Sequence, residues 1–350
     1  MQSDKYSRDN AGQSLKKYIL LKQGELAYNH GASKAKQFGC CYELTEPEAR
    51  IPYVYHCFKI NNHEYTPFIA MALNNAKMDK QLKRLVSSSV RMDGLLNISF
   101  EDYMSVTIHL PSPSEQKHIA DFLQIIDERI ATQEKLLASL KKYKRGVVRT
   151  LLSPDSCCIE EATWTTAKIG DLGSFTKGAP LSKADIAPDG TPFILYGELY
   201  TTYHEVINSV IRRTKAQPEK QYYSHVGDVI IPTSGETPEE ISTAACVMLP
   251  DIILAGDLNI FRSSKIDGRI MSYILNHIVN GQIARIAQGK SVVHIQASEI
   301  SKIEISYPDY NTQCKMISVF ETIATRIKSV ENELTYLRTV QKALLQRLFI

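Results

Sequence analysis

The stretch that decides the fold is SEQKHIADFLQIIDERIATQEKLLASLKKYKRGVVRTLL, residues 114–152, because the chain contains it twice. Residues 115–153 align without a gap to residues 312–350, at a constant offset of 197 residues that relates Gln116 to Gln313. Self-similarity at a fixed offset indicates a repeated structural unit. The chain therefore consists of two related halves, each of which ends in this segment.

Both copies begin with residues that favour the start of a helix. Ser112, Pro113 and Glu115 form a capping-box pattern with proline at the first helical position. Asp309 and Thr312 take the same places in the second copy. The shared chemistry predicts that both segments are helices that start at equivalent positions.

Apolar residues recur every seven positions in both copies, in two interleaved series, which is the pattern of a coiled-coil seam. The polar seam residues Lys144 and Gln341 occupy matching positions, and such residues can fix register and partner choice. A helix of 39 residues spans about 58 Å, comparable to about 17 base pairs of DNA. The helix pair is therefore long enough to set a fixed distance along DNA. The alternative is a pair of ordinary core helices or a homodimer coiled coil. The residues expected in the coiled coil and in partner docking are Ile126, Ile130, Leu137, Leu140, Lys144, Ile323, Ile327, Leu334, Leu337 and Gln341.

A similar series of strand and helix signals precedes each copy. Gly24 with its acidic neighbour matches Gly227 with its own, as a turn into an apolar strand. Residues 97–99 match residues 294–296 ahead of the last strand of each series. Each half is therefore expected to be a mixed α/β globule followed by a long helix. The expected parts are a first domain at 1–111, a central helix at 112–153, a linker at 154–163, a second domain at 164–308 and a C-terminal helix at 309–350.

Composition restricts the function classes. The 350 residues are 43% hydrophobic and 23% charged, which is a globular composition, and the net charge of +3 does not by itself suggest nucleic acid. The opening residues lack the pattern of an export signal, and no long uncharged apolar run occurs, so we expect a cytoplasmic protein. The seven cysteines are odd in number and lack C-x-x-C spacing, which predicts reduced thiols rather than disulfides or a zinc site.

The repeated segment is similar to the spacer helix of the specificity subunit of type I restriction-modification systems. WTTAKIGDLGSFTKG at 164–178, GDVIIPTSG at 227–235 and GKSVVHIQASEISKIEI at 289–305 resemble its target-recognition domain, so the resemblance covers nearly the whole chain. It implies two target-recognition domains joined by two long helices in an antiparallel coiled coil. It further implies that each domain reads one half of a split double-stranded DNA sequence, and that the helices dock two methyltransferase subunits, to which restriction and translocase subunits can be added. S-adenosylmethionine and ATP would bind to those partners only, and this chain would hold no cofactor or metal.

The resemblance also suggests which residues of the second domain contact DNA. Small residues let the backbone approach phosphates, lysines neutralise them, and a glutamine can hydrogen-bond a base edge. For each position the alternative is a solvated turn. The expected DNA-binding residues are Thr176, Lys177, Gly178, Tyr196, Ser234, Gly235, Gln288, Lys290 and Ser291.

The first domain offers fewer candidates. Only 23 residues precede Gly24, whereas Gly227 lies 63 residues after Trp164. About forty residues, including the counterpart of the opening strand and K-G loop, therefore have no match, and truncation, completion by another chain and incomplete reading of a half-site all stay open. The expected DNA-binding residues of this domain are Asn29, His30, Gly31, Lys34, Ser89 and Arg91.

Enzyme signatures are weak. The triplet Gly289, Lys290, Ser291 matches the end of a phosphate-binding loop, but that motif also needs glycine where Ala284 stands. Neither an adenine-methyltransferase motif nor a spaced histidine metal motif occurs. We therefore expect a non-catalytic subunit, with a coiled-coil adaptor that docks partners without full DNA selectivity as the alternative.

Overall fold

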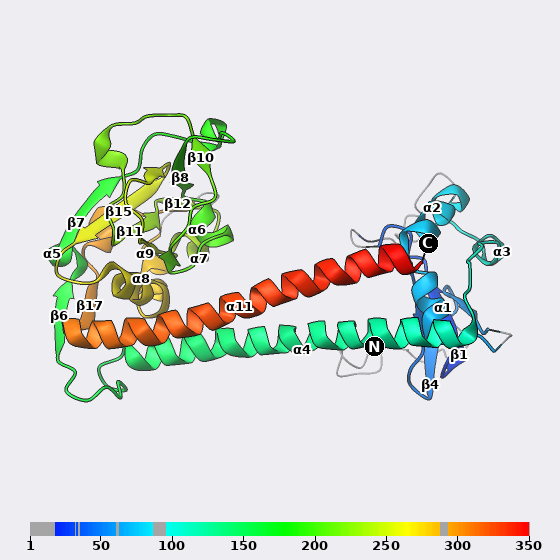
Figure 1. Ribbon diagram of the computed structural model, residues 1–350. Coiled ribbons are helices and arrows are strands. Elements are labelled where there is room, and N and C mark those ends of the chain that lie inside the picture. The colour runs from blue at the N-terminus through cyan, green and yellow to red at the C-terminus, as the bar shows by residue number, and fades with distance from the viewer. Residues whose placement is uncertain are drawn as a thin grey trace. The chain divides into compact units, whose positions relative to one another are not determined.

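The protein, seen in a computed structural model, divides into two compact units (Figure 1). Each unit includes a segment of both long helices, α4 (Pro113–Leu151) and α11 (Tyr310–Leu348). No helix within the described ranges is long and apolar enough to cross a membrane. The first unit comprises residues 1–135 and 331–350, and the second comprises residues 136–330. The structure describes residues 18–31, 33, 36–60, 63–86, 96–287 and 293–349.

The first unit contains two small antiparallel sheets, one with the strand order β3-β2-β5 and the other pairing β1 with β4. Tyr28 on the central strand stacks on Tyr103 with 3.9 Å between ring centroids, and both are buried with Phe68 in one core. Its elements are β1 (Tyr18–Lys22), β2 (Leu26–Asn29), β3 (Cys40–Glu43), β4 (Glu48–Pro52), β5 (His56–Phe58), α1 (Thr66–Ala72), α2 (Ala76–Leu85) and α3 (Phe100–Met104).

The second unit is built on a five-stranded sheet with the order β7-β15-β11-β13-β9, in which the β13–β9 pair is parallel and the others antiparallel. A three-stranded sheet, β10-β8-β14, and the pairs β12–β16 and β17–β6 complete it. Its strands are β6 (Trp164–Lys168), β7 (Gly173–Lys177), β8 (Thr191–Leu195), β9 (Val206–Ile207), β10 (Arg213–Thr214), β11 (Asp228–Pro232), β12 (Ser234–Gly235), β13 (Ala245–Val247), β14 (Ile253–Ala255), β15 (Leu258–Ser263), β16 (Val293–His294) and β17 (Glu304–Pro308). Its shorter helices are α5 (Ile169–Leu172), α6 (Glu198–Thr201), α7 (Pro238–Ile241), α8 (Gly268–His277), α9 (Asn280–Ile286) and α10 (Ala297–Ile300), and single 3-10 turns occupy Lys183–Asp185 and Lys220–Tyr222.

The two units share a three-stranded kernel. The order β3-β2-β5 in the first corresponds to β13-β11-β15 in the second. The turn that enters the central strand is the same in both: Gly24 has φ +79° and donates its N–H to the carbonyl of Leu44, and Gly227 has φ +94° and donates to Val247. Glycine tolerates positive φ without the Cβ clash of other residues, which explains the matched Gly-acid pairs in the sequence.

An asparagine bracket fastens a helix to the kernel in both units. Asn276 accepts the N–H of Ala244, donates to the carbonyl of that same residue, and also donates to the carbonyl of Ser272, at 3.1, 2.7 and 2.8 Å. Asn74 makes the same three bonds, at 2.9, 2.6 and 2.8 Å, to both backbone groups of Cys41 and to the carbonyl four residues before itself. One asparagine side chain in each kernel thus links the helix region to the backbone at β3 or next to β13.

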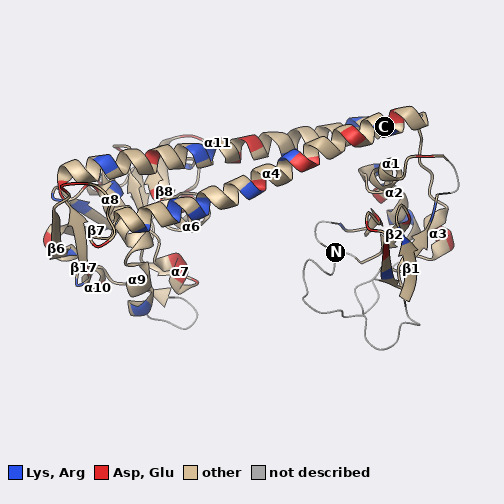
Figure 2. Cartoon of the chain, turned by 90° about the horizontal axis from the view of Figure 1, so that it is seen from below, with Lys and Arg blue, Asp and Glu red and all other residues tan. Residues whose placement is uncertain are grey.

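Within the first unit, the two helix segments run antiparallel (Figure 1), and they carry buried apolar residues and ion pairs that join the two helices. Arg129 lies 2.6 Å from Glu333, and Glu134 lies 2.5 Å from Arg338. Figure 2 shows basic and acidic residues interspersed along both helices. Exposed pairs of this kind contribute little to stability, so the buried seam contributes most of the packing free energy.

Within the second unit, the end of α4 is part of the main core. Val148 and Leu152 are almost fully buried and belong to the same cluster as Ile270, Met316 and Phe320 of α8 and α11. Burial of each such side chain stabilises the fold by about 1.5–3 kcal/mol. The predicted fold class, mixed α/β globules with two long helices in an antiparallel coiled coil, is confirmed.

Candidate nucleic-acid interface

The connection between β14 and β15, Gly256 and Asp257, gathers three of the predicted DNA-facing stretches. Gly178 donates its N–H to the carbonyl of Leu258 next to this connection, and a Cβ at Gly178 would lie 2.8 Å from the Gly256 carbonyl oxygen. Glycine is therefore required in the T-K-G stretch because two backbone segments cross there. The stretch ends β7 beside the start of β15.

Lys177 reaches the same place. Its Nζ donates to Oδ1 of Asn259 at 2.8 Å, and Asn259 is fully buried and donates to the carbonyl of Ile295. Burial lowers the pKa of Lys177, and the carboxylate of Asp257 acts in the opposite direction. An ammonium group has three N–H donors, so Lys177 can be held by Asn259 and still donate to a phosphate or a base edge.

Ser234 and Gly235 lie on the other side of Asp257. The Ser234 hydroxyl donates to the Asp257 carboxylate at 2.8 Å, and the N–H of Thr233 donates to the Asp257 carbonyl at 2.7 Å. Both Ser234 and Gly235 are buried. Ser234 and Gly235 therefore support the interface from inside. Thr176 and Lys177 are exposed and can reach DNA.

Tyr196 completes this edge of the second globule. A Cβ on Gly256 would lie 3.3 Å from Cδ1 of Tyr196, so the ring packs directly over the connection. Three stretches that are far apart in the sequence, around Lys177, Tyr196 and Ser234, thus converge on Gly256 and Asp257. The sequence interpretation missed these two residues, although a Gly-Asp pair between two apolar runs is a recognised turn signal.

A family model described as the type I restriction modification DNA specificity domain matches the chain twice, over residues 16–142 and 161–337. The chain belongs to this family. The two matches cover most of the chain, and they fall on the two halves that the repeat defines. The interpretation of the sequence as a DNA-specificity subunit of a type I restriction-modification system is confirmed.

Solved structures share the fold of this specificity subunit. A type I restriction-modification S subunit from M. genitalium has 15% sequence identity and a TM-score of 0.61, and the match covers 96% of this chain and 85% of that one. A chain from a study of complex assembly and conformational transition in a type I R-M system has 13% identity and a TM-score of 0.57, with 96% and 84% covered. No curated protein matches the sequence.

In the first globule of the specificity subunit, three candidates are described. The side chain of Asn29 accepts the N–H of Gly31 at 2.9 Å and so forms the turn that ends β2. His30 is only 5% exposed, and its two ring nitrogens lie 3.0 and 2.7 Å from the carbonyl oxygens of Leu96 and Val54. Both polar atoms of the His30 ring face the protein backbone, and its contact with DNA stays a prediction.

Several predicted contacts lie outside the described residues. The loop that follows α9 is described up to Ala287 and again from Val293, which pairs with Gly235. Val293, the first described residue after the gap, therefore lies next to β12. The candidates outside the described residues are Lys34, Ser89, Arg91, Gln288, Lys290 and Ser291.

The two polar residues predicted in the coiled coil have different partners. Gln341 donates to the carboxylate of Asp127 on the paired helix. Lys144 instead forms an ion pair with Glu205, which lies in the second globule. The buried members of the set are Ile126, Ile130, Ile323, Ile327 and Leu334, and the partly buried members are Leu137, Leu140 and Leu337. The part of these residues in partner docking stays a prediction.

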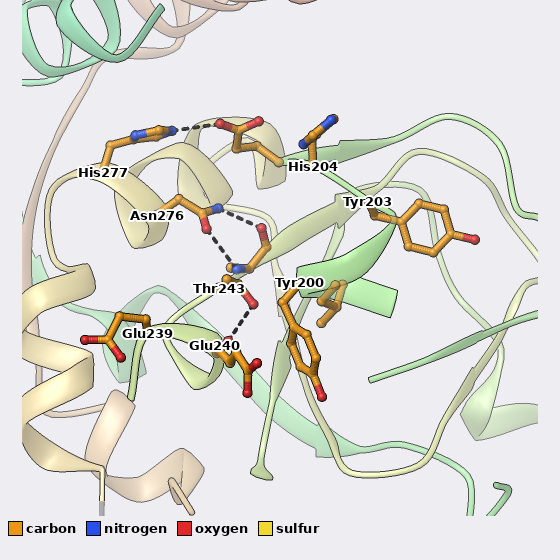
Figure 3. A pocket seen from close by; sticks show the side chains of 11 residues that line it. Tyr200, Tyr203, His204, Glu239, Glu240, Thr243, Asn276 and His277 are labelled. Carbon is orange, nitrogen blue, oxygen red and sulfur yellow. Dashed lines mark hydrogen bonds and ion pairs between the residues drawn. The ribbon is translucent and has the colours of Figure 1, made fainter. Parts of the chain in front are cut away.

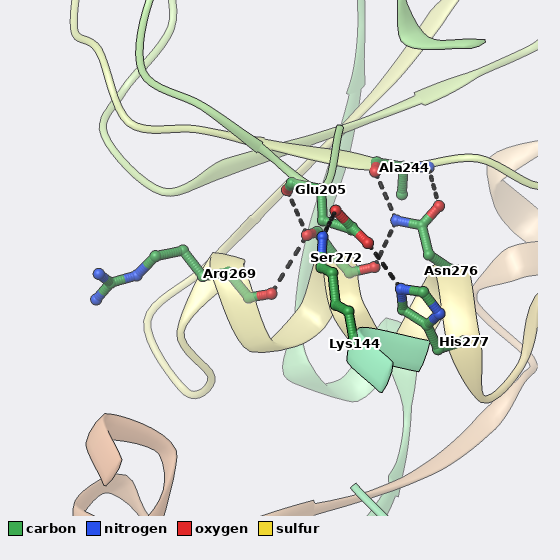
Figure 4. A network of polar contacts seen from close by, with 7 residues as sticks. All are labelled: Lys144, Glu205, Ala244, Arg269, Ser272, Asn276 and His277. Carbon is green, nitrogen blue, oxygen red and sulfur yellow. Dashed lines mark hydrogen bonds and ion pairs between the residues drawn. The ribbon is translucent and has the colours of Figure 1, made fainter. Parts of the chain in front are cut away.

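The ion pair of Lys144 is the centre of a buried polar network (Figure 4). Its Nζ lies 2.6 Å from one carboxylate oxygen of Glu205, and Nε2 of His277 lies 2.7 Å from the other. Burial raises the pKa of Glu205, but the hydrogen bond with His277 and the charge of Lys144 outweigh it and hold the pKa at about 2. Lys144 also lies 5.4 Å from the centre of the Tyr273 ring. The network ties α4 to α8.

A cavity of about 400 Å³ opens beside this network (Figure 3). Its lining includes the carboxylates of Glu205, Glu239 and Glu240, with Tyr200 and Tyr203, and among the described residues it includes neither lysine nor arginine. Glu240 accepts backbone N–H groups as part of the capping box of α7. Carboxylates in this lining would repel a DNA phosphate, so the cavity is not part of the candidate DNA interface.

The described residues contain no group of three or more histidine, cysteine or acidic side chains that could hold a metal ion. All seven cysteines are free thiols. The polar groups near Asp257 are suited to binding DNA and to holding the interface loops in place.

Proposed function

We propose that the chain reads a split DNA target, one half-site with each globule, and holds two N6-adenine methyltransferase subunits on its long helices. The observation that carries this proposal is the duplicated kernel, with the same glycine turn and asparagine bracket in both units. Two equivalent binding modules on one chain fit two half-sites better than one continuous site.

The chain contributes no catalytic residue in this proposal. S-adenosylmethionine binds to the methyltransferase subunits, and ATP binds to restriction and translocase subunits that join the complex. The assembly acts in the cytoplasm, where its DNA substrate lies. Membership of the DNA specificity family supports this division of labour.

Exposed apolar side chains on the long helices mark a docking surface. Phe122 and Ile125, three positions apart on α4, are 49% and 63% exposed, and they share one helix face. Val319 on α11 is equivalent to Phe122 by the 197-residue repeat and is 41% exposed. Large apolar side chains left in water at equivalent positions of the two copies fit two copies of one partner.

The test is to express the chain with the methyltransferase encoded beside it and to map methylated adenines in DNA. A bipartite motif with a fixed spacer is expected. The variant Phe122→Asp should weaken capture of one methyltransferase copy, whereas Tyr53→Ser, an exposed aromatic away from the long helices, should leave it unchanged. A stable complex that methylates without sequence preference would overturn DNA reading by this chain.

The second candidate is an adaptor that docks partners without full DNA selectivity. It is favoured by one observation: within the described residues the sheet built on the kernel has three strands in the first unit and five in the second. A motif in which only one half-site is specific would support this candidate. Lys177→Met should then abolish the remaining specificity, because Lys177 lies in the better-developed globule.

A further inference from the structure

A buried glutamine stands at the fourth position of the first long helix. The side-chain oxygen of Gln116 accepts the N–H of Tyr65 at 3.0 Å, and Tyr65 is the N-cap residue of α1. Its side-chain nitrogen donates to the carbonyl of Pro111 at 2.9 Å and also to the carboxylate of Glu64. Gln116 is fully buried. One amide therefore joins the start of α4, the residue before its cap and the start of α1.

The second long helix carries the same arrangement. The side-chain oxygen of Gln313, the fourth residue of α11, accepts the N–H of Asp267 at 2.9 Å, and Asp267 is the N-cap residue of α8. The side-chain nitrogen donates to the carbonyl of Pro308, the last residue of β17, at 2.8 Å. Gln313 is 2% exposed. The three joined points are equivalent to those in the first unit.

Only an amide of this length meets both requirements. A carboxylate keeps the acceptor and loses the N–H donor, and methionine fills the same space with neither. Buried backbone groups that lose a partner are costly, so the helix start would shift until other groups or water satisfied them. Such a shift changes the direction in which the long helix leaves its own globule.

We propose that Gln116 and Gln313 are positioning residues that fix the departure direction of each long helix, and through it the spacer length between the two half-sites. This inference rests on the proposed function, because it presupposes a bipartite target. Neither glutamine is among the predicted DNA contacts of its own unit, so the bases read in each half-site should not depend on them.

The experiment compares methylation motifs of the complete methyltransferase complex with wild-type chain, Gln116→Met, Gln313→Met and the double variant. The DNA library holds both half-sites constant and varies the spacer one base pair at a time. Preference for the native spacer over its neighbours should fall by roughly five- to tenfold for each variant, the factor expected from the loss of one hydrogen bond. Gln346→Met, on an exposed part of α11, is the matched control and should keep the native preference.

The outcomes distinguish failure of the proposed function from failure of the role given to the glutamines. If wild-type chain gives no bipartite motif, the proposed function fails. If wild-type chain gives one and the variants keep its spacer preference with the complex intact, only the role of the glutamines is overturned. Altered half-site bases would also overturn it. Because methionine can impair folding, urea unfolding of each variant chain is measured in parallel, and a variant that stays folded and keeps the native spacer preference overturns the role of the glutamines.

Discussion

The two units differ at one pair of positions that the repeat makes equivalent, Lys144 in the second unit and Gln341 in the first. Lys144 forms a largely buried ion pair with Glu205, whose side chains are 13% and 12% exposed, whereas Gln341 makes an exposed hydrogen bond to Asp127. The same heptad position thus fastens α4 to a globule in one unit and flanks a helix pair in the other. A heptad pattern shows which positions lie at a seam, but the neighbouring domain decides what a polar seam residue contacts.

The largest expected effect on stability comes from removing the ion pair between Lys144 and Glu205. Lys144→Leu leaves Glu205 buried without its cation, which should destabilise the second unit by about 3–5 kcal/mol. The heptad pattern alone would predict the opposite, because an apolar residue normally strengthens a seam. Trp164 is the chain's single tryptophan and packs against the core of the second unit, so its fluorescence during urea unfolding reports that unit.

Gln341→Leu is the matched variant for Lys144→Leu. Because its hydrogen bond is exposed, the change should stay within about 0.5 kcal/mol. Lys144→Leu combined with Glu205→Leu should recover most of the lost stability, since no charge then stays buried. Equal effects of the two single variants would show that the ion pair is not what distinguishes the units.

Acid should remove part of the same difference. The pKa of Glu205 is about 2 in the folded protein against an ordinary value of 4.5. A depressed folded pKa gives stability that is complete above pH 4.5 and is lost as the pH falls toward 2. The free-energy gap between wild type and Glu205→Gln, measured by urea unfolding at Trp164, should shrink by up to about 3 kcal/mol over that range. A gap that is constant from about pH 6 to about pH 3 would contradict it.

The asparagine brackets test the similarity of the units rather than their difference. Asn74→Leu and Asn276→Leu each remove three hydrogen bonds and leave backbone groups of Cys41 or Ala244 without a partner. Each should cost about 2–3 kcal/mol. Hydrogen exchange followed by mass spectrometry should place each loss in its own unit, and a loss that spreads equally to both would refute the equivalence.

A more modest effect concerns an unsatisfied polar atom on the long helices. The side-chain oxygen of Gln133 is buried without a hydrogen-bond partner among the described residues, and the equivalent position holds the buried Val330. Gln133→Met keeps the volume and removes the unsatisfied group, so the first unit should gain about 1 kcal/mol. Val330→Gln is the reverse change and should destabilise. Hydrogen exchange in the two helix segments measures both, and a loss of protection in Gln133→Met would show that this oxygen has a role in pairing.

Some features of the site followed from local sequence. The matched glycines Gly24 and Gly227 predicted the kernel turns, because positive φ is a local property of the backbone. The stretch around Lys177 was predicted as an interface loop, and the structure places it beside Ser234 as a result of sheet pairing. The brackets were not predicted, since Asn74 and Asn276 are 202 residues apart and fall outside the ungapped repeat.

The sequence by itself determined that two long helices follow two related globules, because helix periodicity, capping and repeats are all written in residues close together in the chain. Only the tertiary structure decided what their polar residues do. Gln116 and Gln313 were visible as an identical pair, yet their partners Tyr65 and Asp267 lie 51 and 46 residues away. Glu205 had no local signal, since a buried carboxylate is recognised only once its cation is brought to it by folding.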